Sequence, residues 1–242
     1  MSNSVEHLNR FEMIGHLSQE PALRHTEAGG PYVRLSLATT ERFTDREGKA
    51  REKIEWHHGI ARGQVAEDIA RAFKKGDALA VSGALHINGY EKAGVKNRVT
   101  DLVVDGFHKN PDNGPSKNEA RLVGVVREDP KVRELGEGRK LVTLSLATNI
   151  PGTNGARGRE DWHTVNLWGK TAEAARDIKA GDTLEITGLL RHRAIPGPDG
   201  KTGADRKLSA IECQKFEVRE RARELAVAPE IRSRGKGVER GV

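Results

Sequence analysis

Cysteine is almost absent from this chain, since Cys213 is the only one among 242 residues. A single cysteine forms no intramolecular disulfide and supplies too few thiolates for a thiolate-rich metal site. The N-terminal residues, MSNSVEHLNRFEM, contain no apolar stretch of the kind found in secretory signals. Nowhere does the chain approach the roughly 20 consecutive apolar residues of a membrane helix. We therefore expect a cytoplasmic protein that does not enter membranes.

Aromatic residues are also scarce, at 4% of the chain, whereas hydrophobic residues as a whole make up 36%. The cores must therefore be built mainly from Val, Leu, Ile and Ala, and each aromatic residue needs its own explanation. The length favours two domains, because domains are most often about 100–150 residues long. The 41 Lys and Arg exceed the 35 Asp and Glu by six. This excess permits a polyanionic partner without demonstrating one.

Sequence signatures of enzymes and metal sites are missing. There is no Walker loop, dinucleotide fingerprint or nucleophile elbow. The nine histidines show no His-x3-His spacing. His57 and His58 are neighbours on an expected strand and point to opposite faces, so we predict structural roles for His57 and His163. We expect no enzymatic activity, no cofactor and no bound metal.

The chain contains an internal repeat. Several short motifs recur in the same order, at offsets of 105 to 109 positions, and every change in length falls in a Gly-rich or charged loop. Such an ordered series indicates duplication of one module. The clearest matches are 13–15 with 122–124, LSLAT at 35–39 with 144–148, Trp56-His57 with Trp162-His163, and Gly76-Asp77 with Gly181-Asp182.

The repeat sets the domain boundaries. We predict a first unit over residues 1–108, a linker over 109–118 and a second unit over 119–218. Residues 108–118 contain no apolar residue except proline, which is typical of a linker. The remaining residues, 219–242, are predicted to form a basic C-terminal tail.

Apolar and polar residues alternate over 32–39, 78–85, 141–148 and 161–168, which is the pattern of half-buried strands. In each unit one interval instead has helical spacing, over 64–73 and 170–179, and Gly76 and Gly181 are predicted to end these helices. The order is three strands, a short helix and two strands. We therefore predict an all-β protein made of two tandem five-stranded OB-fold barrels with one short helix each. An immunoglobulin-like sandwich would need about seven strands and no such helix.

The motifs resemble one family closely. MIGHL at 13–17 with Pro21 and Arg24, the LSLAT run, the Glu55-Trp56-His57 segment and the Lys75-Gly76-Asp77 turn are similar to those of bacterial single-stranded-DNA-binding proteins. The resemblance covers nearly all of residues 9–108 and 119–217. It implies sequence-tolerant binding of single strands in replication, recombination and repair. It also implies a homodimer that presents four OB-folds.

The C-terminus departs from that family, whose chains usually end in an acidic segment that recruits partner proteins. Residues 233–242 are basic here. Recruitment of partners through an acidic tail is therefore doubtful for this chain.

The resemblance also implies the binding residues. Single strands stack their bases on aromatic platforms, and the family pattern places Phe43, Trp56 and Tyr90 at such positions in the first copy. The second copy offers Trp162 and Trp168. Arg62 stands where the second copy has Trp168, and a guanidinium also stacks on bases. Ile150 and Ile195 replace Phe43 and Tyr90 in the second copy.

Backbone contacts are expected from cations that flank these platforms, and such contacts make affinity fall with salt. The predicted set is Arg34, Arg42, Lys49, Arg51, Lys53, Arg62, Lys92, Lys96, Arg98, Arg159, Lys170, Arg191 and Arg193.

Alternative interpretations remain open from the sequence. Trp56 and Trp162 sit beside alternating strands, so they could fill the barrels as we expect of Phe11, Phe73, Phe107 and Phe216. The chain could also be a protein-interaction OB module, such as a primosome or conjugation accessory factor, because the second copy lacks two platform positions. A third alternative is an RNA binder, which would use the same platforms.

Overall fold

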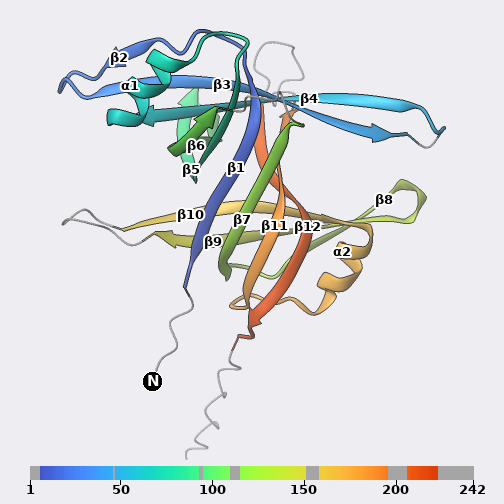
Figure 1. Cartoon of the computed structure of the whole chain (residues 1–242). Coiled ribbons are helices and arrows are strands. Elements are labelled where there is room, and N and C mark those ends of the chain that lie inside the picture. Colours follow the sequence, from blue (N-terminus) through green and yellow to red (C-terminus); the bar gives the residue numbers. More distant parts are fainter. Residues whose placement is uncertain are drawn as a thin grey trace, which may run out of the picture.

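The computed structural model of the chain describes residues 6–45, 47–92, 95–109, 115–150, 158–195 and 206–222. Strands dominate both copies (Figure 1). The first copy contains β1 (Leu8–Leu17), β2 (Leu23–His25), β3 (Pro31–Thr44), β4 (Ala50–Arg62), α1 (Gly63–Ala72), β5 (Ala78–Lys92) and β6 (Val95–Lys109). The second contains β7 (Lys117–Val126), β8 (Lys131–Leu135), η1 (Gly136–Gly138), β9 (Arg139–Ile150), β10 (Arg159–Trp168), α2 (Gly169–Ala174), η2 (Ala175–Asp177), β11 (Thr183–Ile195) and β12 (Arg206–Glu220).

Each copy closes a barrel of five strands. In the first, β1 pairs with β3 and β5, β4 pairs with β3 and β6, and β5 pairs with β6. In the second, β7 pairs with β9 and β11, β10 pairs with β9 and β12, and β11 pairs with β12. The predicted pair of OB-fold barrels is therefore confirmed. The short strands β2 and β8 were not predicted. They pair with β3 and β9 and form the two edges of the sheet.

The two barrels are joined by a strand pair that the sequence pattern did not reveal. Strand β1 pairs antiparallel with β7, from Leu8 opposite Val123 to Ile14 opposite Lys117. Phe11 pairs with Ala120, its own equivalent at an offset of 109. The barrels are therefore related by an approximate two-fold axis through this pair. In Figure 1 the β3–β4 hairpin accordingly projects to one side, and the ends of β9 and β10 near residues 150 and 159 lie on the other.

Both helices differ from their predicted extents. The chain leaves the helical conformation at Phe73 (φ −129°, ψ 153°) after α1 and at Ile178 after η2. The prediction that Gly76 and Gly181 end the helices is therefore wrong. These glycines have φ values of 92° and 89°, and their N–H groups donate to the carbonyls of Leu17 and Val126. They form the turns into β5 and β11, where a left-handed backbone favours glycine.

Alternation along the strands places one set of side chains inside each barrel. Phe11 and Phe73 are buried, and Phe107 and Phe216 pack against the same core, which confirms the prediction for all four. His57 and His163 are 0% and 2% exposed, and their Nε2 atoms lie 2.9 Å from the hydroxyls of Thr39 and Thr148. A buried polar ring needs such a partner, so the predicted structural role of these histidines is confirmed.

Candidate nucleic-acid interface

Trp56 and Trp162 lie on the outer surface of the barrels. Trp56 on β4 is 51% exposed and Trp162 on β10 is 44% exposed. Their sequence neighbours His57 and His163 are buried, because successive side chains of a strand point to opposite faces. The alternative that these tryptophans fill the core is therefore wrong. A large aromatic side chain exposed on the middle of a strand is available to a partner.

The equivalent positions Arg62 and Trp168 end these strands. In register, Arg62 pairs with Tyr32, and Trp168 pairs with Leu141 at the matching place in the second barrel. Arg62 is exposed, whereas Trp168 is half-buried and has the Arg193 guanidinium carbon 5.9 Å from its ring centroid. Arg62 lies six residues after Trp56 on β4, and Trp168 lies six residues after Trp162 on β10. An even separation places each pair of side chains on the same outer face of its strand.

Phe43 lies near the tip of the β3–β4 hairpin and is 46% exposed. The turn beside it is ordered by the Asp45 carboxylate, which accepts hydrogen bonds from the N–H groups of Glu47 and Lys49 and from the Arg51 side chain. These bonds lower the pKa of Asp45, the Arg51 bond most of all. The hairpin thus presents Phe43 on an ordered support.

Several predicted residues cannot be placed as side chains. Tyr90 and Lys92 lie on β5 and Lys96 on β6, but their side chains fall outside the described part of the structure. The same holds for Ile195, whereas Ile150 is half-buried at the end of β9. Their roles remain predictions.

Many of the predicted cations are engaged by carboxylates. Arg159 contacts the buried Asp161 at 2.8 Å, and Lys53 lies 3.8 Å from the buried Glu55. The ion pairs on the β3–β4 hairpin are exposed, so each contributes little to stability, and its cation can exchange the carboxylate for a phosphate. They are Arg42–Glu52 at 2.8 Å, Lys49–Glu47 at 2.9 Å and Arg51–Asp45 at 2.8 Å. Among the predicted cations whose side chains the structure describes, those without an ion pair are Arg34, Arg62, Arg98, Lys170 and Arg193, all exposed.

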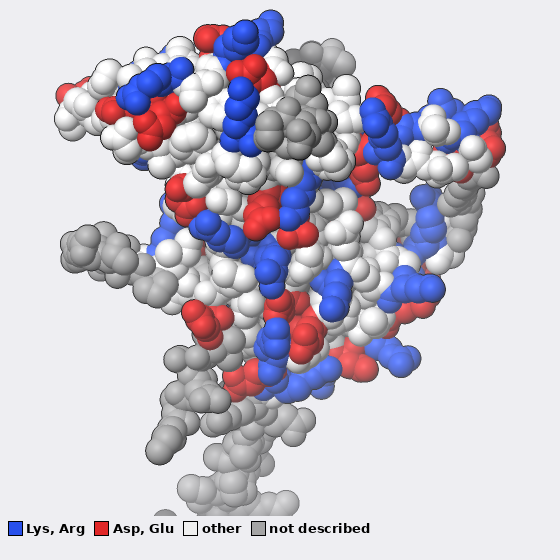
Figure 2. All heavy atoms as spheres, viewed as in Figure 1, with Lys and Arg blue, Asp and Glu red and all other residues white. Residues whose placement is uncertain are grey.

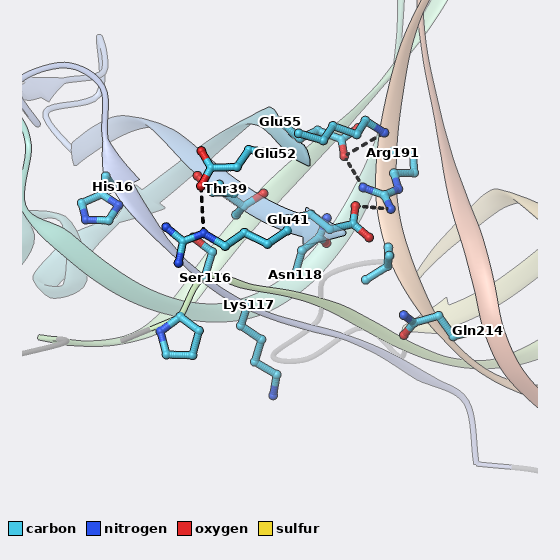
Figure 3. Close-up of a pocket in the computed structure, with 15 residues that line it drawn as sticks. His16, Thr39, Glu41, Glu52, Glu55, Ser116, Lys117, Asn118, Arg191 and Gln214 are labelled. Atoms are coloured by element: carbon cyan, nitrogen blue, oxygen red, sulfur yellow. Dashed lines mark hydrogen bonds and ion pairs between the residues drawn. The ribbon is translucent and has the colours of Figure 1, made fainter. Parts of the chain in front are cut away.

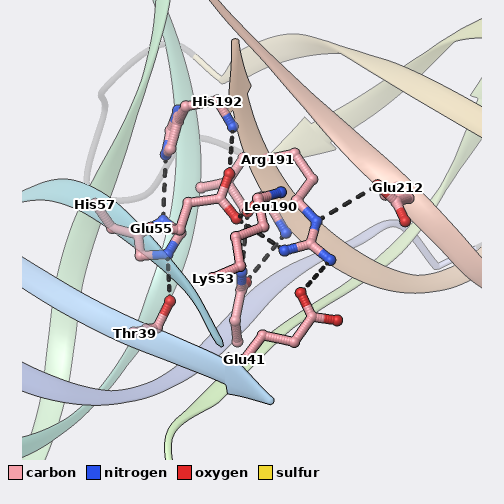
Figure 4. Close-up of polar contacts among 10 residues, drawn as sticks. Thr39, Glu41, Lys53, Glu55, His57, Leu190, Arg191, His192 and Glu212 are labelled. Atoms are coloured by element: carbon pink, nitrogen blue, oxygen red, sulfur yellow. Dashed lines mark hydrogen bonds and ion pairs between the residues drawn. The ribbon is translucent and has the colours of Figure 1, made fainter. Parts of the chain in front are cut away.

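Arg191 has a different environment from the one expected of a phosphate contact. Its side chain is only 12% exposed, and it bonds Glu41 at 2.6 Å and Glu55 at 2.9 Å across the boundary between the barrels (Figure 4). A third carboxylate, that of Glu212, lies 3.4 Å from its Nε. Arg191 is therefore a cross-link between the barrels in this structure, and its role in binding a strand stays an untested prediction.

The boundary between the barrels carries a matched pair of hydrogen bonds. The His192 N–H donates to Glu55, and the Ile87 N–H donates to Asp161, each at 2.8 Å. Glu55 and Asp161 are equivalent at an offset of 106, so each barrel reaches the backbone of the other with the same position. Hydrogen bonds from Arg191 and the His192 N–H outweigh desolvation and lower the pKa of Glu55.

Two hollows lie at this boundary. One has a volume of about 300 Å³ and brings Trp162 and Arg193 of the second barrel together with Ile87 and Arg98 of the first. The other, of about 670 Å³, lies between the β3–β4 hairpin and the start of β7 (Figure 3). In the hollow of about 670 Å³, the charges of Arg42 and Arg191 are already matched by Glu52, Glu41 and Glu55. Of these two, the hollow of about 300 Å³ therefore offers an aromatic ring, Trp162, beside the unpaired Arg98 and Arg193.

Positive charge is not gathered over the strand pair that joins the barrels. Figure 2 shows Lys and Arg interspersed with Asp and Glu over the face where β1 and β7 run side by side. Arg10 pairs with Asp105 at 2.5 Å, and Lys117 pairs with Glu12 at 2.5 Å. Because its cations are paired with carboxylates, this face offers a polyanion little unmatched positive charge.

Comparison with known proteins agrees with the fold. The model of the Single-strand binding protein family matches twice, over residues 8–109 and 117–216. The chain belongs to this family. A single-stranded DNA-binding protein of Thermus aquaticus is 27% identical over 227 residues, covering 86% of this chain and 84% of that protein. One from Deinococcus radiodurans is also 27% identical, over 87% of this chain and 75% of its own length.

A solved structure shows the same two-barrel arrangement. The crystal structure of a deletion mutant of the Thermus aquaticus protein superposes with a TM-score of 0.73 at 27% identity, covering 88% of this chain and 94% of that one. The internal duplication is thus accompanied by a similar relative placement of the two family domains.

Sequence reasoning missed three residues at the face of the second barrel. Arg133 on β8 lines the same hollow as Trp162, and Arg127 and Glu160 contact the Trp162 ring directly. The sequence signal for Arg127 and Glu160 is that the first copy has Ser18 and Ile54 at these positions, whereas Arg133 repeats Arg24 of the first copy. In the described ranges, no group of three His, Cys, Asp or Glu side chains is placed to hold a metal ion. Nor does any described helix have the length and apolarity to cross a membrane.

Proposed function

We propose that this chain binds single-stranded DNA without sequence preference, by stacking bases on Trp56 and Trp162 and by contacting the backbone with nearby cations. The exposure of these two equivalent tryptophans on the barrel faces carries the proposal. Each stacked base contributes roughly 1–3 kcal/mol, independently of base identity. Membership of the family and the names of its relatives support the same conclusion.

The two barrels present different surroundings for the strand. The first adds Phe43 on its ordered hairpin and the unpaired cations Arg34 and Arg62. The second adds the half-buried Trp168 and Arg193, with Arg98 supplied by the first barrel. The first barrel therefore binds through a long hairpin and the second through its barrel face. The remaining predicted contacts, including Lys170, Tyr90, Lys92 and Lys96, belong to this proposal.

The protein acts without chemical catalysis, as a coat on single strands in replication, recombination and repair in the cytoplasm. We also propose a homodimer, because one chain supplies two barrels and a pair supplies four. The mixed charges on the β1–β7 face suit contact between proteins better than contact with DNA (Figure 2). Light scattering with and without oligo(dT) should give a mass of two chains, and a mass of one chain would overturn the dimer.

Titration with oligo(dT), followed by tryptophan fluorescence at two salt concentrations, tests the function. We expect quenching and an affinity that falls as salt rises, since cations release counterions from the strand. Replacing Trp56 and Trp162 together by Ala should weaken binding by at least tenfold, from about 1–3 kcal/mol for each base. Ile54→Ala is the matched control, because Ile54 is 56% exposed two residues before Trp56.

Unchanged affinity in the double variant would refute stacking on these residues. If that variant bound DNA normally but lost a protein partner, the chain would be an interaction module. Competition with oligo(rU) separates the remaining alternative, since tighter binding of the RNA would make RNA the ligand.

A further inference from the structure

Trp162 is restrained by an ion pair beside it. Its indole Nε1–H donates a 2.5 Å hydrogen bond to Oε1 of Glu160. The Arg127 guanidinium carbon lies 5.5 Å from the centroid of the ring, and Arg127 Nη2 also contacts the other oxygen of Glu160. The hydrogen bond limits rotation of the indole, and the guanidinium covers one of its faces. The ring is nevertheless 44% exposed, so the structure leaves indole surface open.

The backbone fixes both members of this pair. Arg127 follows directly on β7, and its N–H donates to the Ser145 carbonyl at 2.9 Å. Glu160 stands two residues before Trp162 on β10, so the two side chains leave the same face of the strand. A planar guanidinium suits this place, because it stacks on an aromatic face while bonding a carboxylate.

The first barrel has the same geometry without the same side chains. The Ser18 N–H donates to the Ser36 carbonyl at 2.9 Å, and Ser36 is equivalent to Ser145 at an offset of 109. Ser18 is therefore the structural equivalent of Arg127. Ile54 occupies the position of Glu160 at an offset of 106, and it neither accepts a hydrogen bond nor carries charge. Within the described residues, no hydrogen bond or ring contact restrains the Trp56 side chain.

We propose that Arg127 and Glu160 are positioning residues that hold Trp162 as a rigid platform for a base, whereas Trp56 is an unrestrained platform. This inference rests on the single-strand binding proposed above and assigns the two platforms different properties. A side chain that is already ordered loses less freedom when a base stacks on it. Removing the restraint should therefore weaken binding at Trp162 by roughly two- to tenfold.

Glu160 allows positioning to be separated from charge. If only electrostatics mattered, Glu160→Ala would remove an anion near the strand and strengthen DNA binding. If Glu160 positions Trp162, the same variant weakens binding in spite of the gain in net positive charge. Arg127→Ala loses both a cation and a ring contact, so by itself it does not discriminate.

The experiment uses the full chain with Trp56→Phe and Trp168→Phe, which leaves Trp162 as the only tryptophan. Time-resolved fluorescence anisotropy measures motion of the indole, and a fluorescently labelled oligo(dT) measures affinity. Glu160→Ala and Arg127→Ala should each increase the amplitude of fast indole motion and weaken binding. Arg127→Lys should keep the charge but restore the rigidity only in part. Ser18→Ala and Ile54→Ala, at the equivalent places in the first barrel, are the controls and should change neither measurement.

Tighter or unchanged binding by Glu160→Ala, or unchanged indole motion in both variants, would overturn the positioning role. Trp162→Ala separates this failure from failure of the proposed function. If Trp162→Ala weakens oligo(dT) binding but the Arg127 and Glu160 variants do not, only positioning is refuted. If Trp162→Ala leaves affinity unchanged, stacking on the second barrel is refuted, and positioning for binding fails with it.

Discussion

Two buried histidines should make this protein sensitive to mild acid. Burial, reinforced by the charge of His192, lowers the pKa of His57 from 6.5 to about 3. Burial likewise lowers the pKa of His163 to about 4. Each imidazole is neutral in the folded chain. His57 shares a hydrogen bond with the Thr39 hydroxyl, and His163 shares one with the Thr148 hydroxyl. In the unfolded chain both rings take up a proton below pH 6.5.

The sign of the effect follows from proton uptake. Between the folded and unfolded pKa values the unfolded state binds more protons, so the free energy of unfolding rises with pH. The stabilisation is fully present above pH 6.5 and is lost as pH falls toward 4 and then 3. Between pH 7 and pH 5 each histidine should remove about 2 kcal/mol from the free energy of unfolding, about 4 kcal/mol together. Carboxylates such as Glu55, whose pKa is lowered from 4.5, act in the same direction at lower pH, so this interval isolates histidine. Half-buried His86, whose pKa is also lowered by burial, adds in the same direction.

Urea unfolding followed by circular dichroism at pH 7 and pH 5 measures the difference. His163→Gln keeps a group that can bond Thr148 but does not titrate, so its pH dependence should be smaller by about 2 kcal/mol. A direct check is NMR titration of the imidazole protons in the unaltered chain, where His57 and His163 should remain neutral at pH 5. Equal unfolding midpoints at the two pH values, or protonation of either ring near pH 6.5 in the folded chain, would refute the reasoning.

Two further predictions concern packing between and within the barrels. Arg191→Met removes the hydrogen-bonded cation of the 6%-exposed Glu55 and leaves Lys53, at 3.8 Å, as its nearby cation, so it should destabilise the chain by at most about 3–5 kcal/mol. Adding Glu55→Gln should recover much of the loss, and additive effects in this double-mutant cycle of urea midpoints would contradict the cross-link. Gly83→Ala would place a Cβ atom 1.9 Å from the Val103 carbonyl oxygen and should lower the melting temperature strongly. Gly48→Ala is its control, since Gly48 (φ 78°) has nothing within 4 Å and suffers backbone strain alone, so an equal loss in both variants would show that close packing at Gly83 is unimportant.

Most of the fold could be predicted because duplication supplied the same pattern twice. Alternation in the LSLAT runs and helical spacing near residues 64–73 are local signals, and the structure follows them. The β1–β7 pair could not be predicted, because backbone pairing between two edges leaves no pattern in side chains. The helix ends were misplaced for a related reason: Gly76 and Gly181 mark a left-handed turn, but the tertiary bonds to Leu17 and Val126 decide where that turn lies.

Exposed aromatic residues could be identified from the sequence, whereas side chains that act through a neighbour could not. Trp56, Trp162 and Phe43 could be recognised from residue type and position, and all three are exposed. Arg191 was grouped with surface cations because its sequence neighbourhood resembles theirs. Only the folded chain shows three carboxylates around it, two of them from the other barrel.

The two copies share several buried contacts, whereas the surroundings of their exposed tryptophans differ. The Thr–His bonds at His57 and His163 are equivalent, and so are the bonds from Glu55 and Asp161 to the opposite barrel. The outer surroundings of Trp56 and Trp162, in contrast, share little beyond the indole. A contact that an approximate two-fold axis repeats constrains both copies at once. The ion pairs of Arg191 with Glu41 and Glu55 are an exception, because the equivalent position in the first barrel is His86. A binding face carries no such constraint, which leaves one copy free to use a mobile platform and the other a fixed one along a single strand.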